Sequence, residues 1–167
     1  MDFDPSRLRI GELIVGASAL VLLASIFLLD WYGLNGTFAP TAQRLGLPSS
    51  VNGWHGLTTV RWLLLLTVGC ALALVYFHAS RRAPALPVAL SVILTVLSLI
   101  TTLVLVYRVL INQPGPGDVI TTRTGAYVGL LSAVALLYGA YRSMRQEGIA
   151  ERDAPAVTAL EWPADPG

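Results

Sequence analysis

Lysine is absent from this sequence, and charged residues of either sign are few. All 11 basic residues are arginine, 13% of the chain is charged, and the formal net charge at pH 7 is +1. So small a positive excess does not fit a nucleic-acid-binding protein, and we expect no nucleic-acid partner. The missing lysine, in a chain rich in alanine, leucine, valine and glycine, indicates the coding bias of a GC-rich genome rather than a chemical requirement.

Cysteine and histidine are also scarce. Cys70 is the single cysteine and lies inside an apolar segment, so it cannot form an internal disulfide. His55 and His78 have no metal-ligand spacing to each other or to Cys70. Glycine-rich phosphate loops, zinc-binding spacings and nucleophile elbows are missing from the sequence. We therefore expect no metal site, no cofactor and no catalytic residue, and so not an enzyme.

Long apolar runs dominate what is present. Hydrophobic residues make up 54% of the chain and the mean hydropathy is +0.65, more than a water-soluble domain of this length tolerates. A bilayer core of about 30 Å requires about 20 helical residues, and the apolar stretches of suitable length lie near 10–29, 57–77, 86–111 and 125–141. We predict an all-α polytopic membrane protein whose four transmembrane helices form an antiparallel bundle. The first apolar run is longer than that of a signal peptide and is expected to be an uncleaved anchor.

The remaining chain divides into a loop and a tail around one domain. Residues 1–145 are expected to form the transmembrane domain, with no room for a second folded unit. Residues 30–56, rich in aromatics, glycine and proline, are expected to fold as an extracytoplasmic cap loop, with or without a ligand of its own. Residues 146–167 are polar and mildly acidic, and we expect a disordered cytoplasmic tail beyond a short continuation of the fourth helix.

Arginine placement predicts the orientation in the plasma membrane. With the N-terminus inside, the cytoplasmic side receives seven arginines, namely Arg7, Arg9, Arg81, Arg82, Arg142, Arg145 and Arg152. The outer side then receives four, namely Arg44, Arg61, Arg108 and Arg123. Because cytoplasmic loops carry the excess of arginine, we predict a multi-pass protein with both termini cytoplasmic.

Two stripes of small or hydroxyl-bearing residues indicate how the helices pack. The fourth span carries small residues at four-residue spacing, namely Gly125, Gly129 and Ala133. The third carries hydroxyls on one helical face, namely Ser91, Thr95, Ser98 and Thr102. In a membrane, such faces allow close helix packing, within one chain or between two copies. A hydroxyl-lined path for a solute is the alternative for the second stripe.

Ionisable residues are missing from the middle of the spans and gather at their ends. A proton- or ion-coupled carrier needs them at mid-depth, and an intramembrane hydrolase needs a base beside its nucleophile. We predict a small charge cluster at the outer ends of the helices, formed by Asp30, Arg61, Arg108, Asp118 and Arg123, in which Asp30 pairs with Arg61 or Arg108. The alternatives are independent arginines that face lipid phosphates, or an anion-binding site.

Four stretches carry a resemblance to a known family. They are "LLDWYG" after the first span, "RRAPALPVALSV" before the third, "YRVLINQPGPGD" after it and "RTGAYVGLLSAVALLYGAYRSMRQE" through the fourth. In these the chain resembles an uncharacterised family of small four-span integral membrane proteins of high-GC Gram-positive bacteria. The resemblance implies fold and location only. It also implies an acidic residue seven positions after Trp54, where this chain has Arg61.

Two functions remain open from the sequence. The first is a non-catalytic integral membrane protein that acts through helix or loop contacts, as an accessory subunit or a self-associating unit. Its partners are then the lipid bilayer and either a second copy or another membrane protein. The alternative is a small-solute or lipid-binding component of a transporter or channel, with the hydroxyl stripe and the outer arginines as its site.

Overall fold

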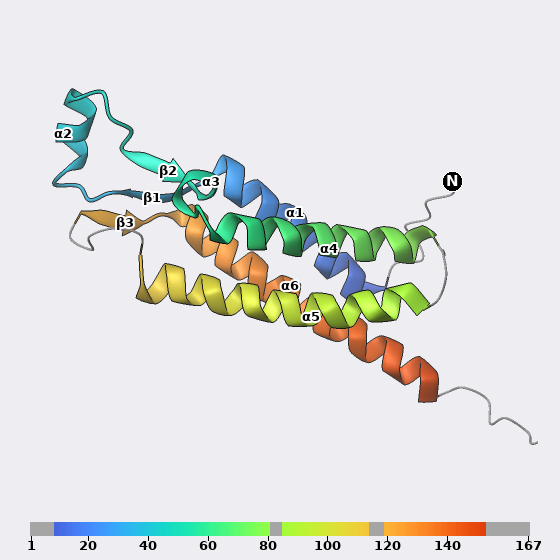
Figure 1. The fold of residues 1–167 in the computed structure, drawn as a ribbon. Coiled ribbons are helices and arrows are strands. Elements are labelled where there is room, and N and C mark those ends of the chain that lie inside the picture. The colour runs from blue at the N-terminus through green and yellow to red at the C-terminus, as the bar shows by residue number, and fades with distance from the viewer. Residues whose placement is uncertain (1–8, 81–84, 114–118, 153–167) are drawn as a thin grey trace, which may run out of the picture.

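Four long helices make up most of the protein (Figure 1). The computed structural model describes residues 9–80, 85–113 and 119–152. The helices are α1 (Ile10–Leu28), α4 (Val60–Ser80), α5 (Ala85–Val106) and α6 (Thr124–Arg152), and a π-helical turn, η2 (Tyr107–Ile111), continues α5. All four are long and apolar enough to cross a membrane, which confirms the prediction of four such helices.

The long helices pack in a closed cycle, α1 against α4, α4 against α5, α5 against α6 and α6 against α1. Fully buried leucines from each helix lie between them, namely Leu22, Leu64, Leu94 and Leu136. Leucines that are more than half exposed cover the outside, namely Leu20, Leu66, Leu103 and Leu131. An apolar surface of this extent on all sides is expected of helices that contact lipid.

Two glycines allow α1 and α6 to approach closely. A Cβ added at Gly139 would lie 3.0 Å from the backbone nitrogen of Val15, and one added at Gly11 would lie 3.1 Å from that of Ser143. Close backbone approach of this kind is how membrane helices gain packing energy without a hydrophobic driving force. These glycines, which the sequence analysis did not single out, mark the tightest crossing of α1 and α6.

A small antiparallel sheet lies at one end of the helices, which we call the sheet end (Figure 1). Its strands are β1 (Asp30–Leu34), β2 (Ser50–Asn52) and β3 (Ile120–Thr122), in the order β2-β1-β3. In the register, Tyr32 pairs with Val51 on one side and with Thr122 on the other. Two short helices, α2 (Ala39–Arg44) and α3 (Gly53–Gly56), complete the segment.

The sheet corrects the expectation of an all-α fold. Within residues 30–56, which were expected to form a cap loop, β1 and β2 pair their backbone groups. Strand β3, from the connection before α6, extends the sheet on the other side of β1. A third strand matters physically, since a two-stranded hairpin alone is marginally stable.

Helix α6 continues beyond the predicted span of 125–141 and ends at Arg152. A short continuation of the fourth helix was expected. Beyond Tyr141 the sequence contains arginine, methionine, glutamine and glutamate, which favour helix, and no proline precedes Pro155. The first part of the expected tail is therefore helical, and the rest of it, residues 153–167, lies outside the described residues.

Candidate functional site

Trp31 anchors the sheet to the helices. Its side chain is fully buried, and its indole Nε1 donates a hydrogen bond to the carbonyl oxygen of Ser25 at 2.9 Å. Two glycines make room for the ring. A Cβ at Gly129 would lie 2.5 Å from Trp31 Cη2, and a Cβ at Gly53 would lie 2.9 Å from Trp31 Cε2. The indole is therefore held between α6 and α3, with no space for a methyl group on either side.

The small residues of α6 thus have more than one kind of partner. At Gly125, an added Cβ would lie 2.5 Å from the carbonyl oxygen of Asp30, so β1 crosses directly over this residue. Gly129 receives the Trp31 ring, and its nearest helical atom is Ser25 Oγ at 3.3 Å. Ala133 is buried and its carbonyl accepts a hydrogen bond from Thr102 Oγ1 of α5 at 3.3 Å. All three residues of the stripe make close contacts. Gly125 and Gly129 contact β1, whereas Ala133 contacts helix α5.

The hydroxyl stripe of α5 lies inside the helix cluster. Ser91, Ser98 and Thr102 are buried. Thr95 donates to the Ser91 carbonyl at 2.7 Å, Ser98 to that of Thr95 at 3.0 Å, and Thr102 to that of Ser98 at 2.8 Å. Hydroxyls bound to their own helix carbonyls are satisfied without a solute. A hydroxyl contact between two helices joins Thr101 Oγ1 of α5 to Thr67 Oγ1 of α4 at 2.7 Å. The sequence analysis did not predict this contact.

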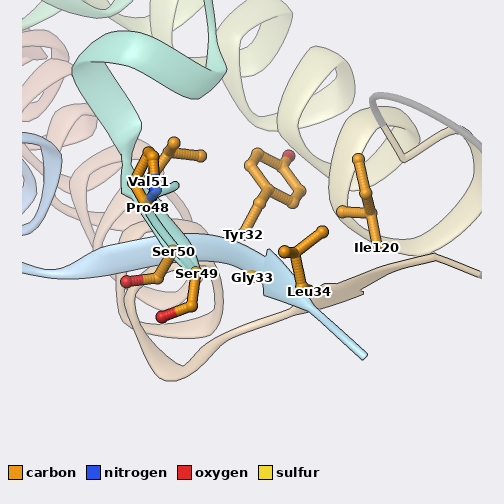
Figure 2. A pocket seen from close by; sticks show the side chains of 8 residues that line it. All are labelled: Tyr32, Gly33, Leu34, Pro48, Ser49, Ser50, Val51 and Ile120. Atoms are coloured by element: carbon orange, nitrogen blue, oxygen red, sulfur yellow. The ribbon is translucent and has the colours of Figure 1, made fainter. Parts of the chain in front are cut away.

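Tyr32 forms the base of a small pocket on the sheet (Figure 2). The pocket has a volume of about 110 Å³ and is lined by Tyr32, Gly33, Leu34, Pro48, Ser49, Ser50, Val51 and Ile120. The Tyr32 hydroxyl donates to the carbonyl oxygen of Arg108, in the π-helical turn, at 3.5 Å. Burial raises the pKa of this hydroxyl above its ordinary value, and the nearby Arg108 charge lowers it to a smaller extent. The pocket can accept one apolar side chain or a similarly small apolar group.

An exposed apolar surface lies beside this pocket, around α2. Phe38 is 45% exposed, Leu45 70% and Leu47 57%, and we call these three residues the α2 patch. A Schellman turn ends α2, because the Leu47 N–H donates to the Ala42 carbonyl at 2.9 Å and the Gly46 N–H to that of Gln43 at 3.1 Å. Gly46 takes the positive φ of 68° that this turn requires.

The α2 patch lies away from the spanning helices. In Figure 1, α2 is beyond the sheet, at the far end from the four long helices. Its exposed leucines therefore belong to a segment outside the candidate membrane spans, where lipid does not explain their exposure.

The predicted charge cluster differs from what the structure forms. Asp30 accepts a hydrogen bond from Ser50 Oγ at 2.7 Å, and within the described part of the chain it makes no ion pair with Arg61 or Arg108. The predicted pairing is therefore wrong for the described side chains, because Asp30 binds Ser50 and Arg61 stacks on tryptophan rings. Asp118 lies outside the described residues.

The arginines at the sheet end have aromatic or backbone partners. The Arg61 guanidinium lies over the Trp54 ring at 4.7 Å and the Trp62 ring at 5.4 Å, and its Nη1 donates to the Trp54 carbonyl at 3.4 Å. The Arg123 side chain covers Gly33 of β1. Cation–π stacking and the carbonyl contact stabilise the Arg61 guanidinium, and among the described side chains no carboxylate forms an ion pair with Arg61 or Arg123.

A buried carboxylate, that of Glu12, lies at the end of the helices opposite the sheet. From the sequence, Glu12 was expected only to lie at the end of a span. Glu12 is 3% exposed, and its Oε2 accepts a hydrogen bond from the Arg9 backbone N–H at 3.0 Å. Its Oε1 lies 3.5 Å from His78 Nε2, while His78 Nδ1 lies 3.0 Å from the Leu74 carbonyl. A carbonyl only accepts, so Nδ1 is the donor in this contact.

Neither the described side chains nor known proteins indicate a reaction or a metal for the residues of this candidate site. Among residues 9–80, 85–113 and 119–152, three or more metal-ligating side chains do not come together. The geometry offers contact surfaces, namely the pocket, the α2 patch and the arginines of the sheet end. No protein-family model, curated protein or solved structure matches this chain.

Proposed function

We propose that this chain is a non-catalytic integral membrane protein that acts through contacts of its sheet end. In this proposal the four helices form an antiparallel bundle across the plasma membrane, with both termini in the cytoplasm and the sheet as an extracytoplasmic cap. The arrangement of arginines supports the orientation, since Arg9, Arg142 and Arg145 lie on segments at the end opposite the sheet.

The observation that carries this proposal is the exposed α2 patch on an ordered segment. Three large apolar side chains stand in a part of the chain outside the candidate spans, displayed by a defined helix and turn. The buried Trp31 and the sheet hold this part of the chain against the helices. Exposed apolar groups on a rigid support are typical of protein-binding surfaces.

The charge of the sheet end favours a different protein over a second copy as the partner. The connections at this end contain Arg44 and Arg123, the adjoining helix ends add Arg61 and Arg108, and the same region contains two aspartates, Asp30 and Asp118. Two copies that met here would bring like charges together, whereas an acidic partner would be attracted. We therefore infer an accessory subunit whose partner is another membrane protein with an extracytoplasmic segment that is acidic and offers an apolar side chain to the Tyr32 pocket.

The alternative function, a small-solute or lipid-binding component of a transporter or channel, has less support. It relied on the hydroxyl stripe as a path, and those hydroxyls donate to helix carbonyls in the interior. A solute that co-purified with the protein in place of a protein partner would favour this alternative.

Affinity purification from native membranes tests the proposal. The wild-type chain should retain one membrane protein at a fixed ratio, and the variant Leu45→Ser/Leu47→Ser should lose it. Gln43→Ala is the matched control, because this exposed residue lies on the same helix outside the patch. Equal retention by the patch variant and the control would refute the α2 patch as the contact surface.

A further inference from the structure

The end opposite the sheet has a second, unrelated surface feature on α6. Tyr138, Tyr141, Arg142, Arg145 and Gln146 line a cavity of about 420 Å³. Four of them follow the spacing of one helical face, at i, i+3, i+4 and i+7. Aromatic and arginine side chains at the end of a spanning helix are those that meet the lipid headgroups.

This cavity continues a face of α6 that is open to lipid. Leu131 is 69% exposed and Val134 46%, and they precede Tyr138 and Tyr141 on the same side of the helix. An acyl chain can therefore lie along α6 while its headgroup reaches the two arginines. A free anion, which has no acyl chain, would contact only the cavity with the two arginines and not the apolar face of Leu131 and Val134.

Three guanidinium groups meet near the cavity. Arg142 and Arg145 line it, and Arg9 of α1 donates from Nη1 to the Gln146 carbonyl at 3.3 Å. Arg145 also lies over the Tyr141 ring at 5.7 Å. Within the described part of the chain, neither Arg142 nor Arg145 makes an ion pair with a carboxylate.

The carboxylate nearest this end in the described side chains is already occupied. Glu12 is buried and faces the Arg9 N–H and His78 Nε2 rather than Arg142 or Arg145. A phosphodiester without a cation of its own would neutralise more of this charge than a zwitterionic headgroup would.

A residue that lines the cavity, Gln146, also carries a buried acceptor. Gln146 Oε1 is buried and has no hydrogen-bond partner among the described residues. A buried acceptor without a donor is costly, so a ligand that donates there is favoured. Headgroup hydroxyls can donate, whereas a choline headgroup has no donor.

We propose that the cavity on α6 binds the headgroup of an anionic, hydroxyl-bearing phospholipid, with Arg142 and Arg145 on the phosphate and Gln146 Oε1 as acceptor for a headgroup hydroxyl. The acyl chain lies on the exposed face above it. This site is separate from the α2 patch and does not depend on the partner proposed there.

Lipid retention from nanodiscs of defined composition tests this site. The protein is placed in discs of equal phosphatidylglycerol and phosphatidylcholine, extracted in mild detergent, and its bound lipids are counted by native mass spectrometry. Two arginines near an anionic headgroup are expected to enrich phosphatidylglycerol by about tenfold over its share of bulk lipid. Arg142→Gln/Arg145→Gln should reduce the retained lipid to the bulk ratio.

Controls separate the site from general charge effects. Arg44→Gln, an exposed arginine at the sheet end, should leave the enrichment unchanged, and the thermal midpoint of each variant checks that it is folded. Gln146→Leu should lower the enrichment, and no effect would remove this amide from the site. Equal enrichment in the double variant and the Arg44 control, or displacement of the lipid by millimolar inorganic phosphate, would overturn the proposal.

Discussion

A single methyl group at Gly129 should destabilise the protein, because it would overlap the ring of Trp31. The added Cβ would lie 2.5 Å from Cη2, well inside van der Waals contact. Movement of the ring is restricted, since it also lies close to Gly53, where a Cβ would lie 2.9 Å from Cε2. Overpacking of a core site costs about 1–3 kcal/mol, and we expect Gly129→Ala to lower the free energy of unfolding by that amount.

The assay is reversible unfolding by sodium dodecyl sulfate in mixed micelles, followed by circular dichroism. Gly69→Ala is the matched control, because it is also a glycine inside a spanning helix but has no atom within 4 Å of its added Cβ. Alanine favours helix over glycine by about 1 kcal/mol in water, so this control should be as stable as the wild type or slightly more so.

A second substitution identifies Trp31 as the cause. Phenylalanine at position 31 is smaller and lacks the N–H that bonds to Ser25, so Trp31→Phe is itself destabilising but relieves the overlap with a methyl group at Gly129. The penalty of Gly129→Ala should then shrink, with a coupling of about 1 kcal/mol between the two sites. Equal stability of the Gly129→Ala and Gly69→Ala proteins, or an unchanged penalty in the Trp31→Phe background, would refute this reasoning.

The remaining predictions concern orientation, pH and charge. In a cysteine-free background, a membrane-impermeant maleimide should label Gly36→Cys in intact cells and Arg145→Cys only after permeabilisation; the reverse would invert the proposed topology. Because burial raises the pKa of Tyr32, the unfolded chain loses this proton first as the pH rises past about 10, and stability should fall there. Tyr32→Phe should show a smaller fall in the same titration, and identical curves would contradict the assignment. Finally, Asp30→Asn and Arg108→Gln should be additive to within about 0.5 kcal/mol, since no ion pair joins them; larger coupling would restore the predicted pair.

Hydropathy and length were sufficient to predict the four long helices from the sequence. A run of apolar residues is a local property, so α1 was expected at 10–29 and is found at Ile10–Leu28. The sheet could not be predicted in the same way. Its central strand pairs with residues 120–122, which are separated from it by two spanning helices, and a three-residue strand has too little sequence for a pattern.

The small-residue stripe shows the same limit within the candidate site. Spacing identified Gly125 and Gly129 as positions of close contact, but a missing side chain does not tell which group fills the space. That group is β1 with Trp31, which follows directly after α1. The predicted pairing of Asp30 with Arg61 failed for a related reason. The aromatic rings that hold Arg61 are near it in sequence, yet ion pairing was considered before cation–π stacking.

Site-specific photo-crosslinking in native membranes tests the central claim most directly, that the α2 patch contacts another membrane protein. A benzophenone side chain would replace Leu47 in the patch and, as a control, exposed Thr58 outside it. We predict one discrete protein adduct from position 47 that is absent from position 58 and disappears with Leu45→Ser. The account would be contradicted by adducts to lipid alone, by an adduct to a second copy of this chain, or by the same adduct from both positions.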